Sequence, residues 1–276
     1  MTESWMPYID AYKAYLDEQK NRDNTRPTRN MVEDYKRGIA KKASEVLNPE
    51  SWTESEIGEG VIGERVIKAV KSHTNLINKF QITPFSDKVK ENSALAERVF
   101  FDLYHDRKDG ECFERLCNII GRKYDVISYL YFILDPNTYL PIRSSTFDGI
   151  FKTLEIDMKT EGRCSWGNYQ EFINTVAAVR DLMREHFQAS DIDLLDAHSF
   201  LWTINEGVLI PGKNNGGGKE GNGEKKVEVG AMVTHKNYGE GKITEITGNN
   251  IYVQFSIGQR IFPYADAIKR RYIILR

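Results

Sequence analysis

Sixteen consecutive residues without a single Ala, Val, Ile, Leu, Met or aromatic side chain divide this chain of 276 residues into two parts. Residues 211–226 include six glycines, and nothing in them offsets the entropy lost when a backbone is ordered. A compact domain rarely contains a structureless segment of this length. We therefore predict a flexible Gly-rich linker over residues 211–227, between an N-terminal domain of residues 1–210 and a C-terminal domain of residues 228–276.

Helical periodicity dominates before the linker. Apolar residues recur at helical spacing over residues 8–16, 61–79, 95–103, 113–120, 147–154, 169–182 and 193–205. The run Val126–Leu134 is apolar on nearly every side, which is typical of a helix at the centre of a domain. No segment alternates convincingly enough to be a strand. The sequence therefore predicts a large all-α domain.

The pattern changes to a period of two after the linker. Short alternating segments cover residues 231–235, 242–246, 251–255 and 260–262. Glycines at 239, 241, 248 and 258 supply the tight turns between them. Five short strands in about fifty residues predict a small, strongly bent antiparallel β-barrel. The expected fold class is a multidomain α + β protein.

Charge also separates the two parts. The formal net charge of −2 divides into −7 for residues 1–210, +2 for residues 211–226 and +3 for residues 227–276. No apolar run approaches the length of a membrane span, and the first residues lack the pattern of a signal peptide. Three cysteines are too few for a disulfide framework or a zinc site. We expect a cytoplasmic protein that does not contact a membrane and has no cofactor or bound metal.

The C-terminal domain has a specific order of residues. The segment Val229–Ile243 contains a glycine, a valine, a histidine, an aromatic residue and a Gly-x-Gly, in that order. It resembles the opening of the Tudor-like barrel at the C-terminus of bacterial superfamily 1 DNA helicases. Residues 251–255 and 261–265 look like the remaining strands of that module. Its first hairpin is similar to the polymerase-binding barrels of CarD type and of transcription-repair coupling factors. The resemblance implies a module that docks on a protein or on nucleic acid, without catalysis.

The helical part resembles a module found in uncharacterised bacterial proteins and restriction-type nucleases. The segments that carry this similarity are residues 139–148, 165–169 and 195–202. In those proteins the module accompanies a separate catalytic domain. The chain has no such domain and no phosphate-binding loop of helicases.

Two candidates for catalysis stand out. Asp157-Met158-Lys159 matches half of a Mg²⁺-dependent nuclease site, with Asp148 as an upstream acid. That chemistry needs adjacent strands, whereas this segment follows a helical pattern and is better interpreted as a polar loop. His198 lies in an apolar segment, where a buried histidine bonded to Asp or backbone is the more common role. We expect that the protein is not an enzyme, and a Mg²⁺-dependent nuclease or restriction subunit is the alternative.

Basic side chains supply the candidate binding residues. Residues 20–42 have a local net charge of +5, and Arg29, Lys36 and Arg37 are candidates to face phosphates or to form an ordinary solvated face. In the C-terminal domain the candidates form a basic rim beside an aromatic residue: Lys236, Tyr238, Lys242, Arg260, Lys269, Arg270 and Arg271. The sequence leaves open whether this rim binds phosphates or docks a protein. An aromatic cage for methyl-lysine is less favoured, because alternation places Phe255 and Phe262 inside.

These observations favour a bacterial adaptor in DNA transactions such as repair, transcription coupling, or phage defence and restriction. The expected partner is a protein that processes nucleic acid, such as a polymerase, a helicase or a nuclease, with DNA nearby. The net charge of −7 on the larger domain argues against tight DNA binding over the whole surface.

Overall fold

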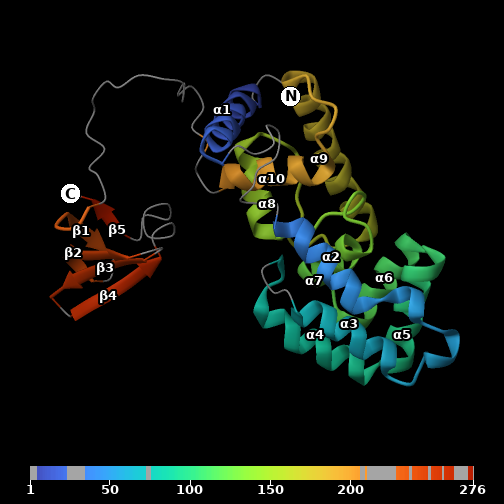
Figure 1. The fold of residues 1–276 in the computed structure, drawn as a ribbon. Helices are drawn as coiled ribbons and strands as arrows, with labels where there is room; N and C mark the ends of the chain where they lie inside the picture. Colours follow the sequence, from blue (N-terminus) through green and yellow to red (C-terminus); the bar gives the residue numbers. More distant parts are fainter. Residues whose placement is uncertain are drawn as a thin grey trace. The chain divides into compact units, whose positions relative to one another are not determined.

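The computed structural model describes residues 5–23, 35–72, 76–205, 209, 228–235, 238–247, 250–256, 258–263 and 273–275. The described helices lie in one compact unit, and the strands lie in a second (Figure 1). The predicted linker at 211–227 and the candidates Arg29, Lys236, Lys269, Arg270 and Arg271 lie outside the described residues.

Ten α-helices build the described part of the first unit. They are α1 (Met6–Asp23), α2 (Tyr35–Leu47), α3 (Val61–Ser72), α4 (Lys79–Glu91), α5 (Ser93–Phe101), α6 (Asp109–Ile120), α7 (Tyr124–Leu134), α8 (Ser144–Thr153), α9 (Trp166–Phe187) and α10 (Leu194–Asn205). The 3-10 turns Pro49–Ser51 and Glu54–Glu56 and a π-helical turn at Asp102–Asp106 complete it. The prediction of a mostly helical N-terminal part is confirmed.

Helix α7 is the central helix that its composition predicted. Every residue from Val126 to Ile133 is buried, and α2, α3, α4 and α6 pack around it. Helix α10 falls where the apolar spacing over residues 193–205 predicted a helix, but burial is not one-sided, because Leu194–Leu201 are all buried. The polar residues of that segment are buried because partners on other elements satisfy them, as described below.

Helix α4 was not predicted. The sequence pattern suggested one helix over residues 61–79, whereas α3 ends at Ser72 and α4 begins at Lys79. Asn78 caps α4 by accepting a hydrogen bond from the backbone N–H of Phe80 at 3.1 Å. Pro84 lies inside α4 and conceals its periodicity, since proline normally ends or kinks a helix.

A carboxylate from α5 holds the beginning of α3. The side chain of Glu97 is fully buried and accepts hydrogen bonds from the backbone N–H groups of Gly58, Gly60 and Gly63, at 2.7, 3.1 and 2.7 Å. These donors have no partner within the first turn of the helix, so the carboxylate satisfies groups that burial would otherwise leave unpaired.

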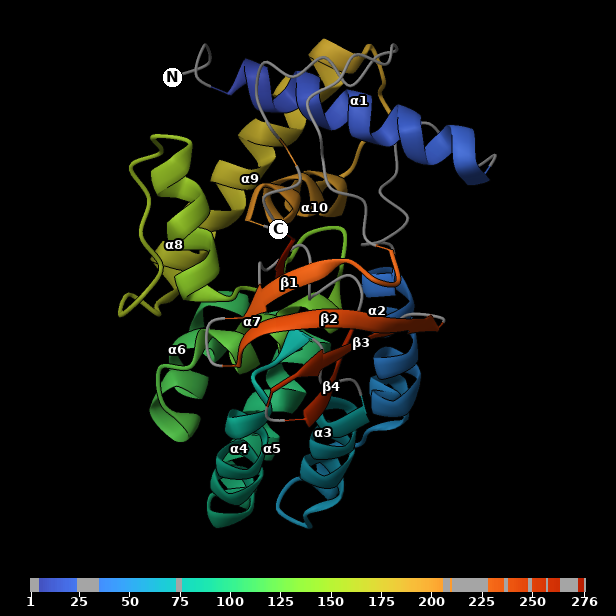
Figure 2. The ribbon, with the colours of Figure 1, turned by 90° about the vertical axis from the view of Figure 1, so that its left-hand side faces the viewer.

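The second unit is an antiparallel sheet with the strand order β4-β3-β2-β1-β5. The strands are β1 (Met232–His235), β2 (Gly239–Thr247), β3 (Asn250–Phe255), β4 (Gly258–Pro263) and β5 (Ile273–Leu275), and β1 to β4 follow one another across the sheet in Figure 2. The chain runs up and down through β1–β4, and β5 then returns to pair with β1. A register shift between Ile243 and Glu245 interrupts the pairing of β2 with β3.

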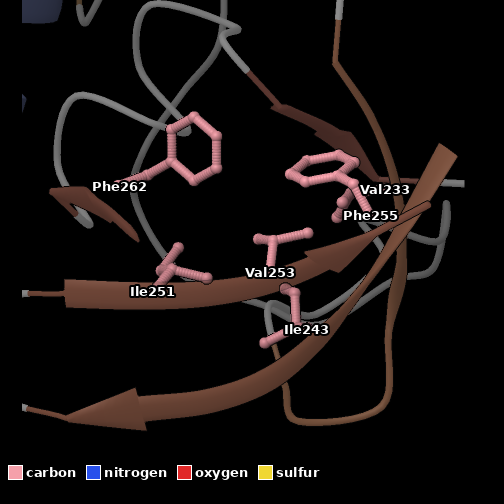
Figure 3. Close-up of a cluster of buried hydrophobic side chains, with 6 residues drawn as sticks. All are labelled: Val233, Ile243, Ile251, Val253, Phe255 and Phe262. Carbon is pink, nitrogen blue, oxygen red and sulfur yellow. The ribbon is translucent and has the colours of Figure 1, made fainter. Parts of the chain in front are cut away.

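The sheet buries one face around six side chains: Val233, Ile243, Ile251, Val253, Phe255 and Phe262 (Figure 3). The two glycines of the Gly-x-Gly motif have different roles. Gly239 has a φ of 72°, a backbone conformation that residues with a side chain rarely adopt. Gly241 lies against the ring of Phe255, and a Cβ at this position would approach that ring to 2.6 Å.

The prediction of a closed barrel is wrong for the part of the sheet that the structure describes. Strands β4 and β5 are the two edges, and no pairing joins them among the described residues. Strand β5 contains only three residues, which pair with β1 alone. The coarser prediction of a small antiparallel sheet after a helical unit is confirmed. None of the described helices is both long and apolar enough to cross a bilayer.

Candidate functional site

The basic segment of residues 20–42 does not present Lys36, which lies at the start of α2, to solvent. The side chain of Lys36 is 1% exposed, and its Nζ lies 3.2 Å from Nδ1 of His198 on α10. The same ammonium lies 5.3 Å from the ring centroid of Trp202. Neither the phosphate-facing nor the solvated-face interpretation holds for Lys36, because it is part of the contact between α2 and α10.

Arg37 joins the same two helices. Its Nη1 lies 2.7 Å from Oδ2 of Asp193, and its Nη2 donates to Oδ1 of Asp193 and of Asp196, both at 2.8 Å. Burial lowers the pKa of Arg37, but its bonds to the two carboxylates outweigh that effect and raise it. The guanidinium of Arg37 therefore binds two carboxylates within the fold. This differs from the phosphate contact that the local charge suggested.

His198 has the structural role expected of it. It is 2% exposed, and its Nε2 lies 2.9 Å from the carbonyl oxygen of Pro141, so Nε2 carries the proton and Nδ1 faces Lys36. Burial, together with the nearby charge of Lys36, holds the pKa of His198 well below its usual value. A neutral imidazole with both nitrogens occupied in the core positions helices rather than transferring protons.

The nuclease-like residues do not converge. The carboxylate of Asp148 accepts hydrogen bonds from the backbone N–H and hydroxyl of Thr160, both at 2.7 Å, and from the backbone N–H of Glu161 at 3.0 Å. Asp157 and Lys159 are exposed in the loop after α8, as the polar-loop interpretation predicted. No group of three or more His, Cys, Asp or Glu side chains within the described ranges is arranged to hold a metal ion.

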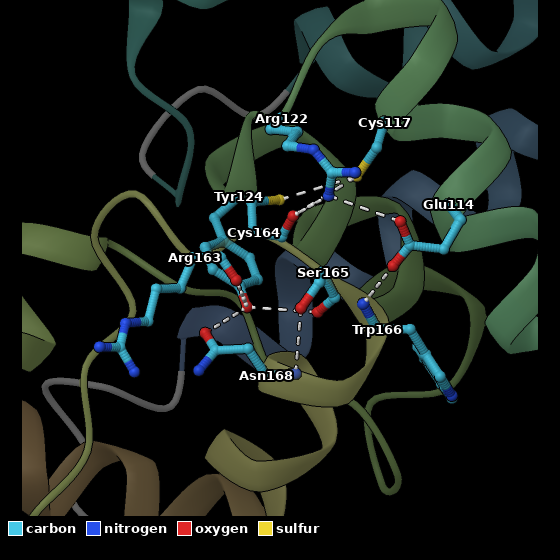
Figure 4. A network of polar contacts seen from close by, with 9 residues as sticks. All are labelled: Glu114, Cys117, Arg122, Tyr124, Arg163, Cys164, Ser165, Trp166 and Asn168. Carbon is cyan, nitrogen blue, oxygen red and sulfur yellow. Dashed lines mark hydrogen bonds and ion pairs between the residues drawn. The ribbon is translucent and has the colours of Figure 1, made fainter.

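Two buried thiols lie within a polar network between α6 and the start of α9 (Figure 4). Sγ of Cys117 is 3.9 Å from Sγ of Cys164. Arg122 donates to the carbonyl oxygen of Cys164 at 2.6 Å and pairs with Glu114 at 3.5 Å. The hydrogen bond between the thiols lowers the pKa of Cys117 and raises that of Cys164. The two thiols pack against each other, and an S–S bond of about 2.05 Å would require the sulfur atoms to move closer together.

The strand register separates the basic residues expected to form one rim. Lys242 is exposed between the buried Gly241 and Ile243, and it pairs with the exposed Gln254. Arg260 pairs with the buried Val253 and lies two residues before the buried Phe262, so it belongs to the core face, opposite the face of Lys242. Lys242 and Arg260 therefore do not act on the same ligand surface of the sheet.

The structure does bring Tyr238 and Arg260 together. The guanidinium carbon of Arg260 is 5.4 Å from the centroid of the Tyr238 ring. The ring of His235 also stacks on the Tyr238 ring, with 4.3 Å between the centroids and 14° between the planes. We call His235, Tyr238 and Arg260 the aromatic–guanidinium stack. His235 was not among the predicted site residues, although it precedes Tyr238 in the motif.

The stack adjoins the end of the sheet core. Tyr238 lies 5.5 Å from Phe255 and 6.5 Å from Phe262 between ring centroids, so the buried aromatics fix its position. Tyr252 pairs with Glu245 and faces away from this core, and it cannot join a cage with Tyr238. An arginine held against an aromatic ring loses less freedom when it binds a carboxylate or a phosphate in two-pronged fashion. The arrangement suits recognition of an anionic group.

We compared the chain with models of protein families, with curated proteins and with solved structures, and none of them matches it.

Proposed function

We propose that the chain is a non-catalytic adaptor in bacterial DNA transactions, such as repair, transcription coupling, or phage defence and restriction. In this proposal the C-terminal sheet is a Tudor-like docking module for a polymerase, a helicase or a nuclease. The observation that carries it is the aromatic–guanidinium stack at the edge of the sheet. The strand order, with β5 returning to β1 after a meander, supports it further.

A protein partner accounts for the stack better than DNA does. Two of the three expected rim positions in the described residues lie on opposite faces, so the described part of the sheet does not present a continuous row of cations to a phosphate backbone. A single preorganised arginine beside aromatic rings is typical of a residue that dominates a protein interface. An acidic side chain of the partner would receive the guanidinium.

The experiment compares the full chain with Arg260→Ala and Lys242→Ala. Both variants lose one exposed cation, but only Arg260→Ala removes part of the stack. Lysates treated with nuclease provide the proteins for capture, and mass spectrometry identifies them. We expect the wild type and Lys242→Ala to retain a polymerase, helicase or nuclease subunit that Arg260→Ala loses.

DNA binding is measured on the same variants by fluorescence anisotropy across a salt series. If the stack contacts a phosphate, Arg260→Ala reduces the slope of log K against log salt by about 1, and Lys242→Ala leaves it unchanged. Capture of no nucleic-acid enzyme, together with DNA binding that does not depend on salt, would refute the proposal.

A further inference from the structure

Three helices of the first unit begin around one cavity of about 510 Å³. Asn78 precedes α4, Lys123 precedes α7 and Arg143 precedes α8, and all three residues line the cavity. Ser144 and Ser145, the first two residues of α8, line it as well. The N-terminus of a helix carries a partial positive charge and points N–H groups outward, so this cavity collects the positive ends of three helices.

Cations surround these helix ends. Arg122, Lys123 and Arg143 line the cavity against two carboxylates, Asp125 and Glu161. Burial raises the pKa of Asp125, while the backbone N–H of Asn78 and the charge of Arg143 act against that rise, so this carboxylate already has partners. Neither Lys123 nor Arg143 caps its helix with its side chain. The balance of donors and charge favours a compact anion with several acceptor oxygens, such as a phosphate group.

A second cavity of about 230 Å³ adjoins the first, because Gln81 and Lys123 line both. Its other lining residues are apolar: Phe80, Pro84, Phe85, Ile120 and Val126. The ring of Phe80 is 77% exposed, although it belongs to a helix that buries its other large apolar side chains. An exposed aromatic ring beside an anion site offers a flat ligand a surface for stacking.

Gln81 lines both cavities, and its buried Oε1 has no hydrogen-bond partner among the residues that the structure describes. A buried acceptor without a donor is costly, and such atoms are rare in native proteins. A ligand that spans both cavities and offers an N–H group at this point would satisfy it.

We propose that the two cavities together bind a nucleoside monophosphate. The phosphate interacts with Arg143, Lys123 and the beginning of α8, the base packs against Phe80, and Oε1 of Gln81 accepts a hydrogen bond from the base. The combined space is of the size that small-molecule sites have, about 300–1,000 Å³. This site is independent of the sheet and does not rest on the adaptor function proposed above.

Isothermal titration calorimetry on the full chain tests the proposal with AMP, GMP, CMP and UMP, with the nucleoside of each, and with inorganic phosphate. We expect at least one monophosphate to bind about tenfold more tightly than inorganic phosphate and than its nucleoside. Arg143→Ser should weaken that monophosphate about tenfold and leave the nucleoside unchanged. Phe80→Ala should weaken the monophosphate and the nucleoside alike.

Both positions are exposed, so these variants keep the fold, and circular dichroism confirms it. Lys152→Ala is the matched control, because Lys152 is an exposed cation in the last turn of α8, away from the cavity. Its affinity should equal that of the wild type. The proposal is overturned if no monophosphate binds at about 1 mM, if inorganic phosphate binds as tightly as every monophosphate, or if Arg143→Ser changes nothing.

Discussion

Replacing Arg37 by methionine tests whether this cation belongs to the fold or to a nucleic-acid surface. Methionine keeps most of the length of the side chain and removes the charge and the donors. In the wild type the guanidinium joins α2 to two carboxylates at the beginning of α10. The variant leaves both carboxylates without this partner, and we expect a loss of stability rather than a loss of binding.

The magnitude follows from the exposure of each partner. The side chain of Asp196 is 6% exposed, and removing one member of a buried pair costs about 3–5 kcal/mol. The side chain of Asp193 is 31% exposed, and a pair of that kind contributes about 0–1 kcal/mol. Because Arg37 itself is 26% exposed and solvent screens its charge, the lower end applies. We expect Arg37→Met to lower the free energy of unfolding by about 3 kcal/mol.

The effect should also depend on pH. Burial raises the pKa of Asp193, but the hydrogen bonds and charge of Arg37 outweigh it and hold that pKa below its usual value. A carboxylate with a lowered pKa in the folded state stabilises the fold above its unfolded pKa of about 3.9, and this contribution is lost as the pH falls through the folded value. The difference between wild type and variant should therefore shrink when the pH is lowered from about 7 to below about 4.

Urea unfolding followed by far-ultraviolet circular dichroism measures this quantity, since the signal comes mainly from the helical unit. Arg180→Met is the matched control, because the carboxylate that Arg180 pairs with in the described part of the chain, that of the adjacent Asp181, is 60% exposed. It should change the free energy of unfolding by less than about 0.5 kcal/mol. A similarly small change in Arg37→Met, or a difference that stays constant with pH, would refute the reasoning.

Four further predictions concern other positions. Glu97→Gln should lower the free energy of unfolding by about 2 kcal/mol in urea, because an amide oxygen replaces a carboxylate that holds three backbone donors; an unchanged value would contradict this. Gly241→Ala should destabilise the sheet by about 1–3 kcal/mol, visible in the thermal loss of strand amide signals by NMR. Diamide should link Cys117 to Cys164 in the folded chain, and mass spectrometry of peptides would show any other pairing instead. Arg143→Ser should raise the free energy of unfolding of the ligand-free chain by about 1 kcal/mol in urea.

The helical unit could be predicted from periodicity wherever burial is one-sided or complete. The run Val126–Leu134, apolar on nearly every side, predicted a central helix, and the structure has α7 there. Helix α4 was missed because Pro84 breaks the pattern and because Phe80, its first apolar residue, points outward. Periodicity detects residues that a helix buries, so a helix with an exposed aromatic ring and an internal proline escapes it.

The binding residues were harder to predict, because charge counts ignore distant partners. Lys36 and Arg37 belong to a basic segment, yet their partners His198, Asp193 and Asp196 lie more than 150 residues away in the sequence. Only the tertiary fold brings these groups together. In the sheet, the parity of the strands did contain the relevant signal.

Alternation along the strands also predicts on which face of the sheet Lys242 and Arg260 lie. Lys242 precedes the inward Ile243, and Arg260 lies two residues before the inward Phe262. Residues of equal parity share a face, so the sequence already separates these two cations. Closure of the barrel could not be obtained in this way, since it depends on whether the edge strands meet.

The cations at three helix starts are electrostatically unfavourable for the helical unit. A positive side chain at a helix N-terminus costs about 0.3–1 kcal/mol, and Lys79, Lys123 and Arg143 all occupy such positions. Two other described helices balance or avoid such a charge: the acids Asp109 and Glu111 follow the N-cap Lys108 of α6, and α9 has a serine cap and basic residues in its last turn. Chains retain locally unfavourable residues mainly where function needs them. If Arg143→Ser stabilises the free chain and weakens a monophosphate, the unfavourable charge serves the ligand; if it changes neither, these cations are ordinary solvated side chains.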